Sequence, residues 1–213
     1  MNITIVSDAT SWFNEFISPF ATELKEQGHI VHHIHKVKEI PKGDIVFYLG
    51  CGQLVPSDIL QRNQHNIVIH ESDLPKGKGW SPLTWQILEG KSTIPITMFE
   101  AVEAVDSGQV YLRQVMQFSG YELVDTLRQV QANTSLEMCR IFLNRYPEII
   151  SEAEQQHGDA TFYPRRRPED SRLDIDKSIR EQFNLLRVVD NERYPAYFEI
   201  DGHKFRIAIY AEN

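Results

Sequence analysis

The sequence predicts an α/β protein, with a doubly wound, mostly parallel sheet followed by a short C-terminal helix and β-hairpin extension. Three observations lead to this fold class. Strand and helix patterns alternate over residues 1–70, one strand pattern is a continuous apolar run, and two strand-like runs flank Asp201-Gly202 near the end of the chain. Alternating strands and helices are typical of a parallel sheet covered on both faces.

The first part of the chain supplies the alternation. Asn2–Val6 is a β-branched run, and apolar residues at helical spacing predict a helix over 12–27. Asp44–Leu49 is apolar enough for a strand buried on both faces. Ligands of such sheets bind beyond the carboxyl ends of the strands. Further elements are predicted over 30–35 (strand), 55–62 (helix) and 66–70 (strand).

The second part of the chain predicts more helices and an antiparallel pair. Pro82 is tolerated in the first turn of a helix over Trp80–Leu88. The two runs around Asp201-Gly202 predict a hairpin, because that dipeptide suits a tight turn. A weak boundary near Gly158 divides the chain into 1–157 and 158–213. The remaining predictions are strands over 94–99, 109–118, 196–200 and 204–210, a long helix from Leu123 to near Pro147, and a helix over 173–189.

Composition narrows the class of partner. The formal net charge is −8, which argues against nucleic acid as the partner. The chain lacks an apolar run of the roughly 20 residues that span a bilayer, and MNITIVSDAT lacks the basic start of a signal peptide. Cys51 and Cys139 are far apart and have no paired neighbour, so we expect neither a zinc site nor a disulfide framework. A cytoplasmic protein fits these features.

Two segments offer acid–base chemistry. His70 ends a predicted strand and opens the loop His70–Pro82, which suits a catalytic imidazole beside a substrate-binding loop. A surface loop with an incidental histidine explains the same pattern. Asp106 precedes Ser-Gly and would serve as a partner for His70 if the fold brings the two together. The alternative is a local turn, which Asp and Gly favour for backbone reasons.

A group of histidines offers a metal site as one interpretation. His33 and His35 share one strand face, and His29 and His32 lie nearby. No carboxylate or cysteine stands at a helpful spacing. We therefore favour a solvated strand edge and expect no metal.

Arginines and glycines offer ligand contacts. Arg165, Arg166 and Arg167 are adjacent, and guanidinium groups fork onto phosphate oxygens, although a solvated loop is an equal alternative. Gly50-Cys51-Gly52 is not a complete dinucleotide-binding motif. Its glycines instead allow the backbone to approach a flat ring.

The motifs together point to a family. A spaced pattern runs from the histidine loop into the next helix, an Asp-Ser-Gly element follows, and an Arg-x-Pro-Glu-Asp stretch lies near the C-terminus. On these motifs the chain resembles the formyltransferases that use 10-formyltetrahydrofolate, which have a Rossmann-like fold, and among them the bacterial sugar N-formyltransferases. The matching residues are His70, Ser72, Leu74, Pro75, Gly79, Pro82, Trp85 and Gly90, then Asp106, Ser107 and Gly108, then Arg166, Pro168, Glu169 and Asp170.

The resemblance implies an activity and the residues that perform it. A formyl group would pass from 10-formyltetrahydrofolate to the amine of a nucleotide-linked amino sugar, for surface polysaccharide or flagellar glycan synthesis. The pseudaminic acid pathway would supply UDP-4-amino-4,6-dideoxy-N-acetyl-altrosamine as acceptor. His70 would stabilise the oxyanion, and Asp106 would orient the imidazole and help to take the proton from the amine. A homodimer is common among such relatives, and the apolar hairpin could offer its interface.

The resemblance also implies binding residues. Residues 1–157 would form the catalytic domain and 158–213 the helix and hairpin extension. The expected folate contacts are the backbone of Leu49, Gly50, Cys51, Gly52, Gln53 and Leu54, together with Val105. The expected contacts to the nucleotide sugar are Ser72, Lys76, Lys78, Trp80, Arg165, Arg166 and Arg167.

One position departs from the family pattern. The family carries an Asn two residues before the histidine as an oxyanion donor, and here that residue is Val68. Asn66 shares the strand face of His70 but lies about 13 Å back along it. A folate- or nucleotide-binding module without turnover therefore stays open, as does a 10-formyltetrahydrofolate hydrolase that uses the same His and Asp. A purine-pathway transferase that acts on a glycinamide ribotide is a further alternative, but the C-terminal helix and hairpin argue against it, since that smaller enzyme type lacks them.

Overall fold

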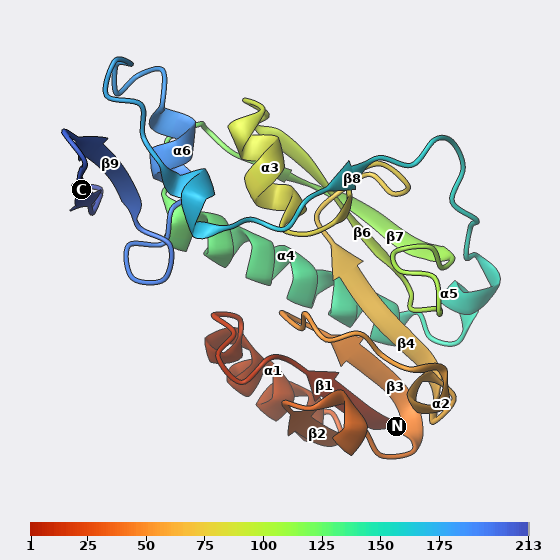
Figure 1. Ribbon diagram of the computed structural model, residues 1–213. Helices are drawn as coiled ribbons and strands as arrows, with labels where there is room; N and C mark the ends of the chain where they lie inside the picture. Colours follow the sequence, from red (N-terminus) through yellow and green to blue (C-terminus); the bar gives the residue numbers. More distant parts are fainter. Residues whose placement is uncertain (213) are drawn as a thin grey trace.

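The computed structural model describes residues 1–212, and its centre is a six-stranded sheet with helices against its faces (Figure 1). The strand order is β2-β1-β3-β4-β6-β7. The first four of these strands pair in parallel, and the β4–β6 and β6–β7 pairs are antiparallel. The mostly parallel α/β class is confirmed. The strands are β1 (Asn2–Val6), β2 (Ile30–Ile34), β3 (Gly43–Tyr48), β4 (Asn63–His70), β6 (Thr93–Glu100) and β7 (Val110–Gln117).

The continuous apolar run of β3 is explained by burial on both faces. Phe47 packs in a large core with Phe20 of α1 (Asn14–Glu26) and Phe142 of α4 (Val124–Asn144). Val46 faces the other side, where a smaller apolar cluster forms with Ile40 and other residues. Side chains alternate along a strand, so a strand that feeds two cores must be apolar throughout.

Shorter elements complete the chain. The helix predicted over 55–62 is only one turn long, and β4 begins earlier than predicted because its first residue pairs with β3. The remaining elements are a 3-10 turn (Val37–Glu39), α2 (Ser57–Leu60), β5 (Lys78–Gly79), α3 (Pro82–Leu88), α5 (Glu148–Ser151), β8 (Phe162–Tyr163), a second 3-10 turn (Pro168–Ser171), α6 (Phe183–Val188), β9 (Ala196–Ile200) and β10 (His203–Ile207).

The helix predicted over 173–189 is wrong in its first half, since only α6 forms. Side chains satisfy the backbone there and close turns in place of a helix. The Gln182 side chain accepts a hydrogen bond from Asp174 N and donates to Asp174 O, and the Glu181 carboxylate accepts one from Ser178 N. Such local bonds compete with helical ones.

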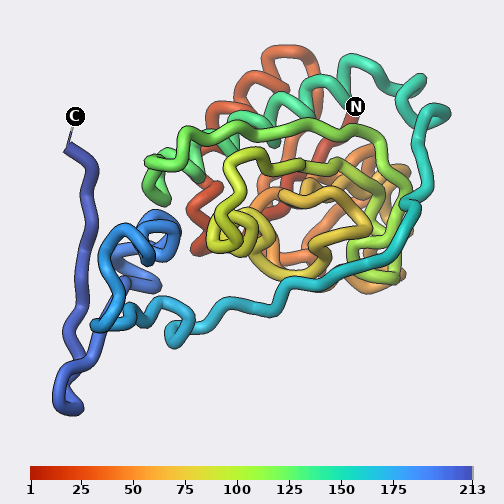
Figure 2. The backbone as a smooth tube through the Cα atoms, turned by 90° about the horizontal axis from the view of Figure 1, so that it is seen from above, coloured from red at the N-terminus to blue at the C-terminus, as the bar shows by residue number. Residues whose placement is uncertain are grey.

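The C-terminal hairpin is confirmed. β9 and β10 pair antiparallel around Asp201 (φ 49°) and Gly202 (φ 79°), two left-handed residues that a tight hairpin turn requires. Phe198 and Phe205 stack across the pair with ring centroids 5.3 Å apart. The hairpin stands away from the sheet, at the far end of the chain (Figure 2).

An extended segment joins α5 to α6 and runs across the molecule, and the sequence pattern did not predict its pairing (Figures 1 and 2). Within it, β8 pairs in parallel with β5, so that Phe162 lies beside Lys78. This two-residue ladder ties the segment to the histidine loop. Among residues 1–212, no helix is both long and apolar enough to cross a bilayer.

Candidate active site

His70 is the last residue of β4 and is almost fully buried, at 8% exposure. Its Nε2 lies 2.8 Å from the backbone oxygen of Gly77. A carbonyl oxygen only accepts hydrogen bonds, so Nε2 must carry a hydrogen. Nδ1 is therefore the ring atom left to exchange a proton or to bind a ligand group.

Asp106 lies in the loop between β6 and β7 and has a left-handed backbone (φ 51°). Its carboxylate accepts a hydrogen bond of 2.9 Å from Gly79 N. In the described chain, no hydrogen bond joins Asp106 directly to His70. The loop is tightly placed, because a Cβ on Gly108 would lie 1.7 Å from Glu100 O.

Three consecutive residues connect the two candidates. Gly77 O accepts from His70, Gly79 N donates to Asp106, and between them Lys78 Nζ donates to Ser107 Oγ at 2.7 Å. Lys78 is only 9% exposed. His70 and Asp106 are thus linked through the backbone of Gly77–Gly79, and the Lys78 ammonium group is bound to Ser107, the residue after Asp106.

Sequence reasoning missed the residues that hold this site together. Thr161 Oγ1 accepts a hydrogen bond from Gly77 N, and Thr161 O accepts one from Lys78 N. The Gln156 side chain donates to the backbone oxygens of Asp106 and Gly108. These residues belong to a polar stretch without a motif, so only their place in the fold reveals their role.

Val68, at the position where the resemblance implies an Asn donor, has no side-chain donor of its own. Val68 packs against the apolar clusters of Tyr48 and Phe99. Asn66 is already engaged, because its Oδ1 accepts from Tyr48 OH and its Nδ2 donates to Leu60 O. His70 contacts Gly77 O, and the next residue, Lys78, carries a charged donor.

The loop after β3 has a backbone fixed by hydrogen bonds, and it carries an exposed apolar side chain. Asp8 fixes it by accepting from Gly52 N at 2.9 Å and from the Gln53 side chain at 2.8 Å. A Cβ on Gly52 would lie 3.3 Å from the Trp80 ring, so the flat ring that this glycine approaches is the protein's own. Leu54 is 75% exposed, and Val105 on the β6–β7 loop is 57% exposed. Exposed apolar side chains can pack against a flat heterocycle such as a pterin, and nearby backbone groups can form hydrogen bonds with its edge.

Three other expected folate contacts, Leu49, Gly50 and Cys51, begin the same loop. Leu49 is buried in the main core, and a Cβ on Gly50 would lie 2.3 Å from Ser11 Oγ. Cys51 is half-buried, and burial raises the pKa of its thiol to about 11. The Leu49 side chain packs inward, whereas Gly50 is exposed, so any folate contact here is made by the backbone.

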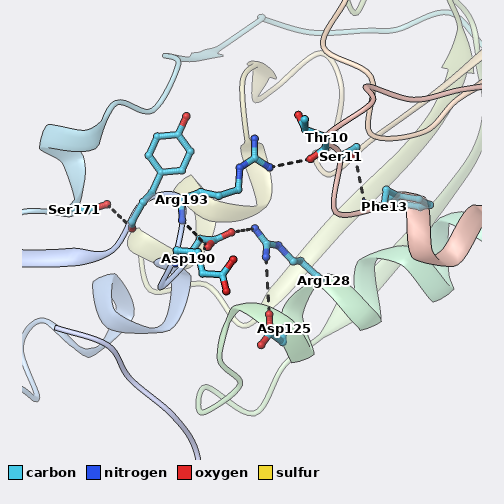
Figure 3. Close-up of polar contacts among 10 residues, drawn as sticks. Thr10, Ser11, Phe13, Asp125, Arg128, Ser171, Asp190 and Arg193 are labelled. Atoms are coloured by element: carbon cyan, nitrogen blue, oxygen red, sulfur yellow. Dashed lines mark hydrogen bonds and ion pairs between the residues drawn. The ribbon is translucent and has the colours of Figure 1, made fainter. Parts of the chain in front are cut away.

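A cavity of about 320 Å³ lies beside the end of the histidine loop, between α3, α4 and the C-terminal extension. Trp80, Arg165 and Arg166 all line it, as the sequence predicted for substrate contacts. Arg193 reaches back to Thr10 O, and Arg128 of α4 lies across from it (Figure 3). The wall also includes Trp12, Glu71, Gln131, Asp190 and Tyr194.

The cavity is rich in guanidinium groups that the protein does not neutralise. Arg165 lies over the Trp80 ring at 4.7 Å, and Arg166 Nε is a buried donor without a partner in residues 1–212. Burial lowers the pKa of Arg166. Arg128 is different, since it pairs with Asp190 at 2.7 Å. Aromatic rings and guanidinium groups that form no ion pair within residues 1–212 together suit a ligand with a flat base and phosphates.

Four expected substrate contacts, Ser72, Lys76, Lys78 and Arg167, do not line this cavity. Ser72 is 2% exposed and sits under Gly77, whose Cβ would lie 2.9 Å from it. Lys76 and Arg167 are exposed but do not line the cavity. The N-terminal histidines also lie apart: His33 and His35 meet at 4.8 Å, and both contact Ser7 Oγ. No cluster of three or more metal-binding side chains occurs in residues 1–212.

Known proteins share both the sequence pattern and the fold. A family model described as "Formyl transferase" matches residues 22–138. A curated relative, the methionyl-tRNA formyltransferase of Streptococcus gordonii, is 27% identical over 201 residues, which cover 90% of this chain and 64% of the relative. The chain therefore spans less than two thirds of the length of the curated relatives that it matches.

Solved structures show the same fold. The methionyl-tRNA formyltransferase from Clostridium thermocellum superposes with a TM-score of 0.80 at 20% identity, covering 100% of this chain and 94% of its own. A sugar N-formyltransferase from Shewanella sp. FDAARGOS_354 gives 0.71 at 19% identity, covering 100% and 98%. HypX from Aquifex aeolicus in complex with tetrahydrofolic acid gives 0.76 at 17% identity, covering 98% of this chain and 37% of its own.

Proposed function

The chain belongs to the formyl transferase family, and we propose that it transfers a formyl group from 10-formyltetrahydrofolate to the amine of a nucleotide-linked amino sugar. One observation carries the choice of acceptor: the cavity that joins Trp80 to Arg165, Arg166 and Arg193. Pockets for small molecules typically measure roughly 300–1,000 Å³, so this one is of a size for a small acceptor. Its tryptophans suit a nucleotide base and its guanidinium groups suit a diphosphate.

The proposed folate contacts are exposed apolar residues of the loop after β3 and of the β6–β7 loop. Leu54 and Val105 offer surface to the pterin, and Asp8 fixes the backbone that precedes Leu54. When bound, 10-formyltetrahydrofolate supplies the formyl carbon, which gains a bond to the acceptor nitrogen and loses its bond to N10 while the proton given up by the amine ends on N10. The solved HypX complex supports the choice of donor.

The chain's own residues then have distinct tasks. His70 keeps Nε2–H on Gly77 O, which leaves Nδ1 to bind or to move a proton. Asp106 orients the imidazole only through Gly79, so it acts as a positioning residue. Lys78, which is buried and bound to Ser107 beside Asp106, supplies positive charge where negative charge develops on the formyl oxygen. Losing one such donor typically costs roughly 3 kcal/mol of transition-state stabilisation, so a substitute for the missing Asn matters.

A mass measurement tests the proposal. The protein is incubated with 10-formyltetrahydrofolate and UDP-4-amino-4,6-dideoxy-N-acetyl-altrosamine, and the product should gain the mass of one formyl group. A parallel screen of UDP-, TDP- and GDP-linked amino sugars identifies the nucleotide. His70→Ala should slow turnover by roughly 10²–10⁴-fold and leave folate binding intact. Glu103→Gln, on the same loop as Asp106 but exposed, is the matched control.

Other outcomes separate the alternatives. Formate released without an acceptor would indicate a hydrolase, and binding without turnover would indicate a binding module. Formylation of methionyl-tRNA in preference to every sugar would assign the acceptor named for the curated relatives. Unchanged rates in both His70→Ala and Asp106→Asn would contradict the assigned site.

A further inference from the structure

The residue after His70 is a carboxylate that the proposed chemistry has not used. Glu71 is half-buried and lines the cavity, whereas His70 is not among the lining residues. Glu71 Oε1 accepts a hydrogen bond of 2.6 Å from Gln131 Nε2 of α4. Within residues 1–212, the second oxygen forms no hydrogen bond with any other residue.

Glu71 differs from the other carboxylate of the cavity. Asp190 is neutralised by Arg128 and also accepts from two backbone N–H groups. No ion pair forms on Glu71 among the described residues, although Arg128, Arg165, Arg166 and Arg193 line the same cavity. A carboxylate withdrawn from water without a cation is costly, so its place on a ligand cavity indicates that the ligand brings the cation.

We propose that Glu71 binds the amino group of the acceptor and takes its proton. The inference rests on the proposed function and deepens it. The guanidinium groups repel an ammonium group, so a ligand with phosphates at one end and an amine at the other has one favourable orientation. Its phosphates lie at Arg165 and Arg166, and its amine lies at Glu71, one residue from His70.

The proton transfer makes the amine a nucleophile. An N–H bond of the ammonium breaks and an O–H bond forms on the Glu71 carboxylate, which leaves the nitrogen lone pair free. Burial raises the pKa of Glu71, while the charge of His70 and the hydrogen bond from Gln131 lower it in part. A carboxylate of raised pKa accepts a proton more readily than an exposed one.

Binding measurements without folate test the inference independently of turnover. UDP-4-amino-4,6-dideoxy-N-acetyl-altrosamine and its 4-hydroxy counterpart are titrated into the wild type, Glu71→Gln and Glu137→Gln by calorimetry. Glu137 lies on α4 with its side chain 56% exposed, which makes it a matched control. The wild type and Glu137→Gln should bind the amine roughly tenfold or more tightly than the alcohol, as expected for a charge-assisted hydrogen bond. Glu71→Gln should bind both equally.

A second variant separates this role from a structural one. Gln131→Leu removes the donor to Glu71 but keeps the negative charge, so the preference for the amine should persist. If Glu71 only anchors α4, Gln131→Leu will damage binding and Glu71→Gln will keep the preference, and the inference is overturned. Should Glu71→Gln fail to fold, Glu71→Asp retains the charge one methylene shorter, and its preference should fall between the other two.

The failures of the two proposals are distinguishable. Equal binding of amine and alcohol by a wild type that still formylates the amine overturns the role of Glu71 alone. A wild type that binds neither compound overturns the choice of a nucleotide sugar.

Discussion

The central sheet and the C-terminal extension are held together by different forces. The sheet encloses a core in which Phe47, Phe99 and Phe142 are at most 1% exposed. The extension, residues 158–212, has a small apolar cluster of its own around Leu186 and Ala196, and it adds Val188 to the main core. Apolar burial stabilises the first region, whereas this smaller apolar contact and specific polar contacts together place the second.

Polar contacts of the extension are few and directional. Arg187, 3% exposed, donates to Glu122 O and to the Glu122 carboxylate. Trp85 Nε1 donates to Pro164 O at 2.8 Å, across the connecting segment. Directional bonds fix position better than apolar contact does, which matters because the extension forms one wall of the proposed acceptor cavity. The comparison predicts that damage to the sheet unfolds the protein, whereas damage to the extension loosens the cavity.

The largest effect is expected in the core. Phe142→Ala removes a fully buried ring that packs edge to face against Phe47 at 6.1 Å, and it should lower the free energy of unfolding by about 3–5 kcal/mol. Denaturant unfolding followed by circular dichroism measures the loss. A loss below about 1 kcal/mol would show that the sheet does not depend on this burial.

The next effect is expected where the extension meets α4. Glu122→Gln leaves the buried Arg187 without its carboxylate, which should cost about 3 kcal/mol. Hydrogen exchange should rise in α6 and not in β3. The control is Glu199→Gln, which removes a pair with Arg172 that is 59% and 38% exposed and worth less than about 1 kcal/mol. Equal exchange in both regions would mean that the two are not separately held.

The pH dependence of stability tests the same contact between the extension and the segment before α4. Partial burial alone would raise the pKa of Glu122, but hydrogen bonds from Ser119 and Gly120 outweigh it and lower the pKa to about 2. Because the folded pKa lies below the unfolded value, the ionised carboxylate stabilises the fold above about pH 4.5, and this contribution is lost as the pH falls toward 2. Melting curves should therefore show a larger acid-induced decrease for the wild type than for Glu122→Gln. Parallel decreases would contradict the assignment.

The smallest effect is expected at the hairpin. Phe205 is 48% exposed and stacks only on Phe198, so Phe205→Ala should cost about 1 kcal/mol or less. Thermal unfolding measures this. A loss as large as that of Phe142→Ala would show that the hairpin is buried in an assembly, as the expected homodimer requires, and light scattering would then reveal a drop in mass.

Sequence patterns predicted the sheet because its strands are selected by burial. Val46 and Phe47 point to opposite sides of β3 and both must be apolar. The histidine loop and the left-handed Asp201-Gly202 turn were also visible, since their chemistry lies in adjacent residues. The first half of the helix over 173–189 was not, because a helical spacing of Ile175 and Ile179 does not reveal that Gln182 will bind the backbone instead.

The residues of the candidate site divide in the same way, into those visible in local motifs and those placed only by the fold. His70 and Asp106 were proposed from local motifs, and the fold places them on either side of Gly77–Gly79. Glu71 and Thr161 carried no motif, and their positions on the cavity and beside β5 depend on contacts with distant parts of the chain. Charge alone did not separate Arg166 from Arg167, although only Arg166 lines the cavity.

The amino-acid sequence by itself determined the fold class, the order of the core elements and the identity of the histidine loop, because periodic burial and short motifs are properties of neighbouring residues. The tertiary structure alone decided which polar residues meet: that Asp106 reaches His70 through Gly79, and that Glu71 faces the arginines of the extension. The physical reason is that hydrogen bonds and ion pairs act over a few ångströms between atoms whose separation along the chain carries no periodic signal.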